Sequence, residues 1–82
     1  MTKKEMITKM QLREAAAWLA FRQAVKEWGD GDSITKRRCA EWCALSGLLE
    51  DVGVAADQQL ADNQAALAIC IAEARARQQA AA

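Results

Sequence analysis

The residues best suited to bind a metal or do redox chemistry are three cysteines, Cys39, Cys43 and Cys70. Cys39 and Cys43 are four residues apart, so a helix would place both thiols on one face, one turn apart. A zinc site needs about four ligands, and the chain has no histidine, so a carboxylate would have to complete the set. Thiols on adjacent turns of a regular helix seldom reach disulfide geometry. We therefore expect small buried cysteines and predict no metal site and no cofactor.

Acid–base or phosphate chemistry has little support in this sequence. Histidine, the usual general base near neutral pH, is absent. The run Gly29-Asp30-Gly31-Asp32 has alternating acids like those of a calcium loop, but the glutamate that completes such a loop does not follow. Its negative charge would also repel phosphate. We interpret residues 29–32 as a turn, and we predict no catalytic residues and a non-enzymatic protein.

The densest positive cluster is Lys36-Arg37-Arg38. It falls near the start of a predicted helix, the end that repels cations electrostatically. It is interpreted either as a solvated face with local ion pairs or as a contact for phosphate or an acidic partner surface. A DNA-reading helix after Gly47 would need basic or amide side chains, but Leu48-Leu49-Glu50-Asp51 follows. We therefore expect no direct reading of DNA, although a small DNA-binding regulator stays an alternative.

The elements that position these residues are predicted to be helices. The sequence lacks proline and is rich in alanine from residue 55 to residue 82, and both facts favour helix. Thr2-Lys3-Lys4-Glu5 fits a capping box, and the same template fits Thr8 to Gln11, which would make the start ragged. We predict one all-α domain over residues 1–82, with helices over about 3–28, 33–52 and 54–79.

Two features of this arrangement stay open. Gly53 either ends the second helix, with Asp57 capping a third, or lies within one long helix at a cost of roughly 1 kcal/mol relative to alanine. We favour the break. The fold is then an antiparallel helical hairpin with a third helix, and the alternative is a hairpin with a long helical extension. Asp32 or Ser33 is expected to cap the second helix.

Helical phasing gives the first two helices more apolar surface than a hairpin can bury. In the first helix a broad apolar stripe contains one charged residue, Glu14. Leu12 and Leu19 lie on the other side of the helix, nearly opposite this stripe. We therefore expect a homo-oligomer, most simply a two-fold dimer. Glu14, and Asn63 in the third helix, are polar residues at apolar seams. They either fix the register of packing or lie at an exposed edge.

Three of the four aromatic residues are tryptophans, Trp18, Trp28 and Trp42. Tryptophan is enriched where binding energy concentrates. Trp18 and Trp28 share the stripe of the first helix and are expected in the core or a dimer seam, so Trp42 is our first choice for partner contact. The predicted partner or oligomer interface consists of Leu12, Trp18, Leu19, Phe21, Trp28, Lys36, Arg37, Arg38, Trp42, Leu60, Leu67 and Ile71.

In its length, its helix-forming start (Thr2-Lys3-Lys4-Glu5-Met6), its helical hairpin and its lack of catalytic residues, the chain resembles small phage-encoded regulators such as antirepressors. The resemblance implies a protein that disables a partner, for example a transcriptional repressor, by binding it. Unpaired cysteines and the lack of a signal peptide or a long apolar run predict a cytoplasmic protein without a membrane segment. A structural subunit or assembly chaperone is the remaining alternative.

Overall fold

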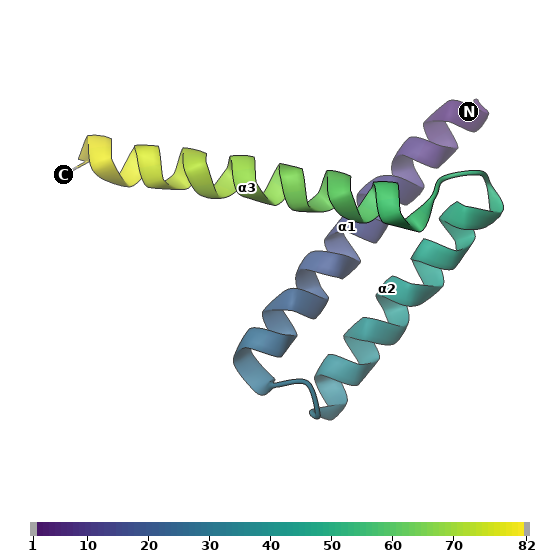
Figure 1. The fold of residues 1–82 in the computed structure, drawn as a ribbon, viewed down its shortest axis with the longest axis horizontal. Coiled ribbons are helices and arrows are strands. Elements are labelled where there is room, and N and C mark those ends of the chain that lie inside the picture. The colour runs from purple at the N-terminus through teal and green to yellow at the C-terminus, as the bar shows by residue number, and fades with distance from the viewer. Residues whose placement is uncertain (1, 82) are drawn as a thin grey trace.

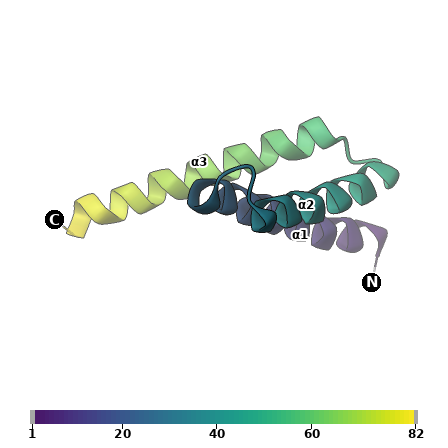
Figure 2. The same ribbon diagram turned by 90° about the horizontal axis from the view of Figure 1, so that it is seen from below.

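Three helices form the fold, α1 (Lys3–Trp28), α2 (Ser33–Asp51) and α3 (Ala56–Ala81). The computed structural model describes residues 2–81. α1 and α2 run antiparallel as a hairpin, and α3 crosses one face of it and extends well beyond (Figure 1). Seen from below, α3 forms a second layer over the hairpin (Figure 2). The all-α prediction, with a hairpin and a third helix, is confirmed.

The start of α1 follows from its capping residue. The Thr2 side chain accepts a hydrogen bond of 3.2 Å from the backbone N–H of Glu5, which satisfies one of the free donors at the helix start. The Thr8 hydroxyl instead donates to the Lys4 carbonyl at 3.0 Å inside the helix, so the second capping template does not begin it. Gly29, with φ of 84°, ends α1 by donating to the Val25 carbonyl at 3.0 Å.

The ends of α2 decide both open points of the sequence. Asp32 caps the helix, since its Oδ1 accepts from the Ile34 N–H at 2.8 Å. The helix ends at Asp51, and Gly53 adopts φ of 94°, a left-handed conformation that favours glycine. The chain therefore breaks at Gly53. α3 begins at Ala56, two residues later than predicted, with Asp57 inside its first turn and not at its cap.

The core between α1 and α2 is small. Within residues 2–81, the apolar side chains that are almost fully buried are Trp18, Ala24 and Leu49. The buried Thr35 hydroxyl donates to the Ala24 carbonyl at 3.2 Å and ties the start of α2 to the end of α1. Polar side chains are thus as prominent in the interior as apolar ones.

The molecule is open for its size. It spans 46 × 34 × 21 Å with a radius of gyration of 14.9 Å, where a compact domain of this length has about 12 Å. Its accessible surface is 6096 Å², against about 4,900 Å² expected for a compact monomer of this mass. About 1,200 Å² of additional surface is therefore exposed in the single chain.

Most of this extension is the far part of α3, residues 68–81, which we call the arm. Up to residue 80 its side chains are exposed except for the half-buried Ala74. Ile69 is 60% exposed and Ile71 is 44% exposed. No helix within residues 2–81 combines the length and the apolar character needed to cross a membrane.

Candidate functional site

A chain of hydrogen bonds crosses the junction of the three helices. The Gln11 Nε2 donates to the Gln59 Oε1 at 3.1 Å, and the Gln59 Nε2 donates to the Asn63 Oδ1 at 3.0 Å. The Asn63 Nδ2 donates to the Glu14 Oε1 at 2.8 Å, and the Trp42 Nε1 donates to the same oxygen at 2.7 Å. We call these five residues the polar network. It joins α1, α2 and α3 through side chains alone.

The polar network is buried and internally satisfied. Glu14 is 1% exposed, and Gln59 and Asn63 are each 5% exposed. No buried side-chain nitrogen or oxygen within the described residues lacks a hydrogen-bond partner. Because burying an unpaired polar group is costly whereas a paired one is tolerated, the network specifies how α3 docks. The two seam residues of the sequence thus lie in the interior and not at an exposed edge.

Two members of the polar network, Gln11 and Gln59, were not predicted. Each lies on the same helix face as one of the two seam residues. Gln11 is three residues before Glu14, and Gln59 is four residues before Asn63. That spacing was the available signal. Glutamine on a half-buried face is common enough that the spacing becomes informative only once Glu14 and Asn63 are known to meet.

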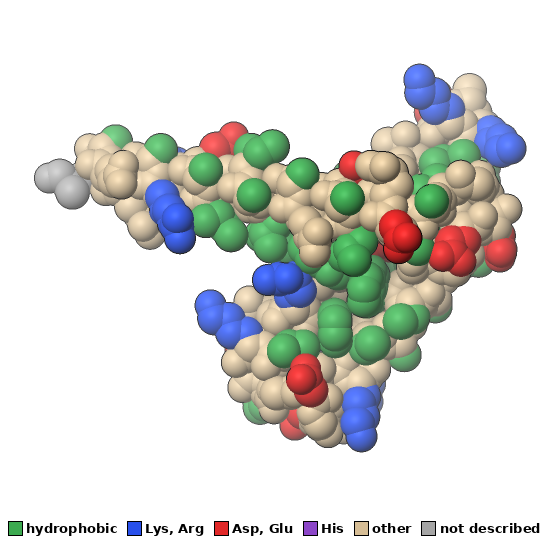
Figure 3. All heavy atoms as spheres, in the orientation of Figure 1, with side chains coloured by type: hydrophobic (Ala, Val, Ile, Leu, Met, Phe, Trp, Pro, Cys, Tyr) green, Lys and Arg blue, Asp and Glu red, His purple; other side chains and the backbone are tan. Residues whose placement is uncertain are grey.

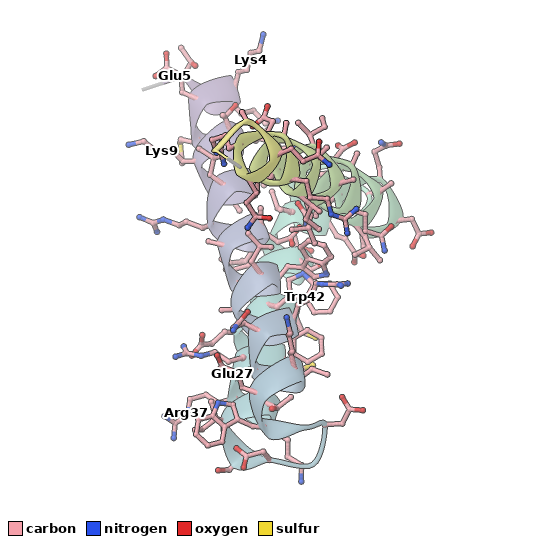
Figure 4. The ribbon with its side chains drawn as sticks, turned by 90° about the vertical axis from the view of Figure 1, so that its left-hand side faces the viewer. Lys4, Glu5, Lys9, Glu27, Arg37 and Trp42 are labelled. Carbon is pink, nitrogen blue, oxygen red and sulfur yellow. The ribbon has the colours of Figure 1, made fainter. Side chains whose placement is uncertain are left out.

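Trp42 is held by contacts within the chain. Its indole N–H bonds to Glu14, and its ring stacks on Phe21 with centroids 5.5 Å apart and planes 15° apart. Figure 4 shows Trp42 beside the hairpin, on the side on which α3 lies, and below α3. These contacts explain the position of Trp42 without a partner, and its predicted partner contact stays a prediction.

Trp18 belongs to the core and is 3% exposed. The Arg22 guanidinium lies over its ring, 5.1 Å from the centroid, an arrangement in which the cation is attracted to the electron-rich face. Trp18 also lines an apolar notch of about 150 Å³ between α1 and α3, together with Ala15, Leu19, Asn63, Ala66, Leu67 and Cys70. The predicted interface residues Leu19 and Leu67 therefore meet at this notch.

A wider hollow shares Leu19 and Leu67 with the notch. Its volume is about 650 Å³, and its walls include the apolar residues Phe21 and Val25, the basic residues Arg22 and Lys26 and the acidic residue Asp30. Figure 3 shows hydrophobic side chains gathered where α3 leaves the hairpin and continuing along the arm. Leu60 is half-buried on α3 near its start, whereas Ile71 is exposed on the arm.

The closed end of the hairpin carries the third tryptophan and the basic cluster. Trp28 is 55% exposed and Ile34 is 39% exposed. Lys36, Arg37 and Arg38 are all exposed. Arg38 forms an ion pair of 3.2 Å with Glu41, the only one that residues 2–81 contain. Figure 4 places Arg37 and Glu27 together at this end. We call Trp28, Ile34, Lys36 and Arg37 the turn-end surface.

Among residues 2–81, Leu12 is the most exposed of the large apolar residues. It is 67% exposed on α1, where helical phasing places it on the side opposite the core stripe. It lines neither the notch nor the wider hollow. The predicted interface residues therefore do not form one continuous patch but divide among the junction, the turn-end surface, the arm and Leu12.

The cysteines do not lie where the sequence predicts. Cys39 is half-buried, while Cys43 and Cys70 are exposed, so the expectation of small buried residues is wrong for two of the three. The Cys39 and Cys43 sulfur atoms are 3.9 Å apart and share an S–H···S contact. Partial desolvation raises the pKa of the Cys43 thiol although the residue is exposed as a whole, and its hydrogen bond and charge interaction with Cys39 raise it further. Within the described part of the chain, no three carboxylates and thiols gather as a metal site would require.

The chain matches no protein-family model, no curated protein and no solved structure. Its function is therefore inferred from its own geometry.

Proposed function

We propose that this chain is a non-enzymatic protein-interaction module, a regulator or inhibitor that binds a partner protein with its turn-end surface. The observation that carries this proposal is the exposure of Trp28, which is 55% exposed at the end of α1. A connection of four residues separates it from α2, whose first turns carry the basic cluster. Tryptophan and arginine are the residue types most enriched among the few that dominate binding energy. A half-exposed tryptophan at the same end of the hairpin as an exposed Arg37 has the composition of such a hot spot.

The role of Trp28 differs from that of the other two tryptophans. Trp18 is buried in the core, and Trp42 donates its N–H to Glu14 and stacks on Phe21. Trp28 instead leaves more than half of its surface in water. Burying a large apolar side chain stabilises a protein or complex by roughly 1.5–3 kcal/mol. Folding of the single chain leaves most of the Trp28 surface exposed, so a partner that covers Trp28 would gain this free energy on binding.

The charges of the turn-end surface indicate the chemistry of the partner. Lys36 and Arg37 are exposed at a helix start, where cations destabilise the helix. An acidic partner surface would offset that penalty and steer association. By the resemblance to antirepressors, a transcriptional repressor is the class of partner we propose. The free thiols of Cys39, Cys43 and Cys70 support a reducing compartment such as the cytoplasm.

A structural role for the polar network supports a non-enzymatic function. Its buried members already use one another as hydrogen-bond partners. A catalytic acid or base must instead reach a proton on the substrate. The network thus resembles a device for fixing helix orientation more than a reaction centre.

A matched pair of double variants tests the proposal. Trp28→Ala with Arg37→Ala removes the apolar and basic parts of the turn-end surface. Leu12→Ala with Arg13→Ala removes an exposed apolar residue and an exposed basic residue in the first half of α1, away from the turn-end surface. We expect the first variant to weaken capture of the partner from host extract, measured by quantitative mass spectrometry, at least about tenfold. The second should leave capture within about twofold of the original chain.

Three results would contradict this function. Equal capture by both double variants would show that the turn-end surface does not bind. Salt-sensitive binding to duplex DNA that is lost with Arg37→Ala would favour the DNA-binding alternative. A partner recovered at fixed stoichiometry, without which the chain does not fold, would instead support a structural subunit.

We propose further that the chain forms a homo-oligomer, most simply a two-fold dimer. The exposed surface of 6096 Å² exceeds that of a compact monomer by about 1,200 Å². Small chains with a small apolar core commonly complete it by association. Light scattering on the purified chain measures the number of subunits directly, and a monomer at all concentrations would exclude this part of the proposal.

A further inference from the structure

We propose that Cys39 and Cys43 together form a binding site for Cu(I), a soft metal ion, which would be held between their two sulfur atoms. The site lies outside the turn-end surface and does not depend on the function proposed for that surface. Four-ligand zinc coordination, which the sequence does not support, is not required for such a site.

The two sulfur atoms are spaced as the ligands of one metal ion are. They lie 3.9 Å apart. Two thiolates that bind one ion at about 2.3 Å are about 3.8 Å apart at the tetrahedral angle and about 4.6 Å apart in a linear arrangement. A disulfide bond would instead need the sulfur atoms at about 2.05 Å. The observed distance therefore suits an ion between the sulfur atoms better than a bond between them.

Trp42 fixes the rotation of α2 where the two thiols project. It lies between Cys39 and Cys43 in the sequence. Its indole N–H donates to Glu14 of α1 at 2.7 Å, and its ring stacks on Phe21 of the same helix. Because these contacts hold α2 against α1, the two thiols keep their direction. A pair of ligands that is already in place loses little conformational freedom when it binds an ion.

The two thiols can be reached from solvent. Cys43 is exposed and Cys39 is half-buried. The neighbours of Cys43 one turn away on the helix surface include Ala40 and Gly47, which are small. Nothing lies within 4 Å of a Cβ built at Gly47. An ion can therefore approach the pair without any opening of the hairpin.

The donor set selects the metal. Thiolates are soft ligands that favour Cu(I) and zinc over harder cations. Zinc takes about four ligands, but no third cysteine or carboxylate joins the pair within residues 2–81. Cu(I) needs only two thiolates, and small rotations of the two side chains can open the pair toward the linear arrangement. In the reducing compartment proposed above, copper is present as Cu(I).

Binding at this site is a ligand exchange without a redox step. Each thiol gives its proton to the solvent, and each sulfur donates an electron pair to the ion. About two protons are therefore released for each Cu(I) bound, while copper and sulfur keep their oxidation states. Two bonds from sulfur to copper replace the S–H···S contact between Cys39 and Cys43.

The three cysteines provide a matched test. The reduced chain is titrated with Cu(I) under exclusion of oxygen, in competition with the coloured chelator bicinchoninate. We expect the original chain to bind a single Cu(I). Cys39→Ser and Cys43→Ser should each weaken binding about 100-fold or more, because the loss of one of two linked ligands removes the chelate effect. Cys70→Ser, which removes the exposed thiol of α3, should change the affinity by less than about threefold.

A spacing variant tests the geometry with the number of thiols unchanged. Cys43→Ala combined with Ala44→Cys moves one thiol by a single residue, to a position about 140° from Cys39 around the helix. We expect this variant to bind Cu(I) as weakly as Cys43→Ser does. Circular dichroism of all variants checks that the helices persist.

Three results would overturn the copper site. The first is binding that is no tighter in the original chain than in Cys43→Ser or the spacing variant. The second is a loss in Cys70→Ser as large as that in Cys43→Ser, and the third is bound zinc that Cu(I) does not displace. The variant Trp28→Ala/Arg37→Ala should bind Cu(I) as the original chain does, so failure of copper binding and failure of the proposed function are distinguishable.

Discussion

Asn63 donates a hydrogen bond of 2.8 Å to the Oε1 of Glu14, a residue 49 positions earlier in the chain. Trp42 donates to the same oxygen at 2.7 Å. One atom of α1 therefore receives bonds from both α2 and α3, and all of these side chains are buried or half-buried. Because α3 crosses the hairpin at this place (Figure 1), Glu14 fixes where α3 docks and hence where the arm points.

Removing the Glu14 side chain should strongly destabilise the fold. In Glu14→Ala the N–H groups of Trp42 and Asn63 lose their shared acceptor inside the protein. An unsatisfied buried donor costs about 1–3 kcal/mol, so we expect the free energy of unfolding to fall by about 3 kcal/mol. Urea denaturation followed by circular dichroism measures this change.

Glu14→Gln is the matched control, because it keeps an acceptor oxygen at the same place. We expect its free energy of unfolding to stay within about 1 kcal/mol of the original. If alanine and glutamine at position 14 reduced stability equally, the shared acceptor would not be what holds the helices together.

The two contacts of Trp42 can be separated by substitution. Trp42→Phe removes the N–H bond to Glu14 but retains an aromatic ring against Phe21, and it should destabilise by about 1–2 kcal/mol. Trp42→Ala removes both contacts and should destabilise by about 3–5 kcal/mol. The same urea measurement applies. Equal losses in the two variants would show that the hydrogen bond dominates and that ring packing contributes little.

The sequence predicts the helices and their breaks well, since each depends on local chemistry. Thr2 and Asp32 cap their helices as capping chemistry requires, and Gly29 and Gly53 end them with positive φ. Capping and helix termination act over a few residues, so no knowledge of the tertiary fold is needed. The same holds for the antiparallel hairpin, because a connection of four residues leaves the two helices few other arrangements.

The direction of α3 and the roles of single side chains could not be predicted. Glu14 and Asn63 stood out as polar residues on apolar faces, but their meeting depends on how three helices pack. Trp42 looked available from its place on α2, yet its indole N–H is used by a carboxyl group 28 residues earlier. Long-range hydrogen bonds leave no periodic trace in the sequence. The exposure of Cys43 and Cys70 likewise follows from which helix faces α3 leaves uncovered.

Two glycines should respond to alanine with opposite signs. Gly47 lies inside α2, and nothing lies within 4 Å of an added Cβ, so Gly47→Ala should stabilise by about 0.5–1 kcal/mol. Gly53 has equal space but a φ of 94°, and Gly53→Ala should destabilise by about 1–2 kcal/mol. Thermal denaturation detects both, at about 4–8 °C per kcal/mol for a domain of this size. Similar shifts of Tm in the two variants would show that the positive φ at position 53 does not penalise a residue that has a Cβ.

The reactivity of Cys43 should depend on Cys39. Partial desolvation, the hydrogen bond with Cys39 and the charge interaction with Cys39 all raise the pKa of the Cys43 thiol. A raised pKa lowers the thiolate fraction at any pH below it, and only the thiolate is nucleophilic. At pH 8 we therefore expect Cys43 to react more slowly with iodoacetamide in the folded chain than in the urea-unfolded chain.

The substitution Cys39→Ala removes two of these three causes, so the pKa of Cys43 should fall toward its ordinary value and its alkylation at pH 8 should accelerate. Mass spectrometry of the alkylated peptides separates Cys43 from Cys70, whose labelling in the same sample controls for the reagent. The pH profile gives the sign independently, because the rate at Cys43 should reach its plateau at lower pH in Cys39→Ala than in the original chain. If the two profiles coincided, the 3.9 Å contact between the sulfur atoms would have no effect on the ionisation of Cys43.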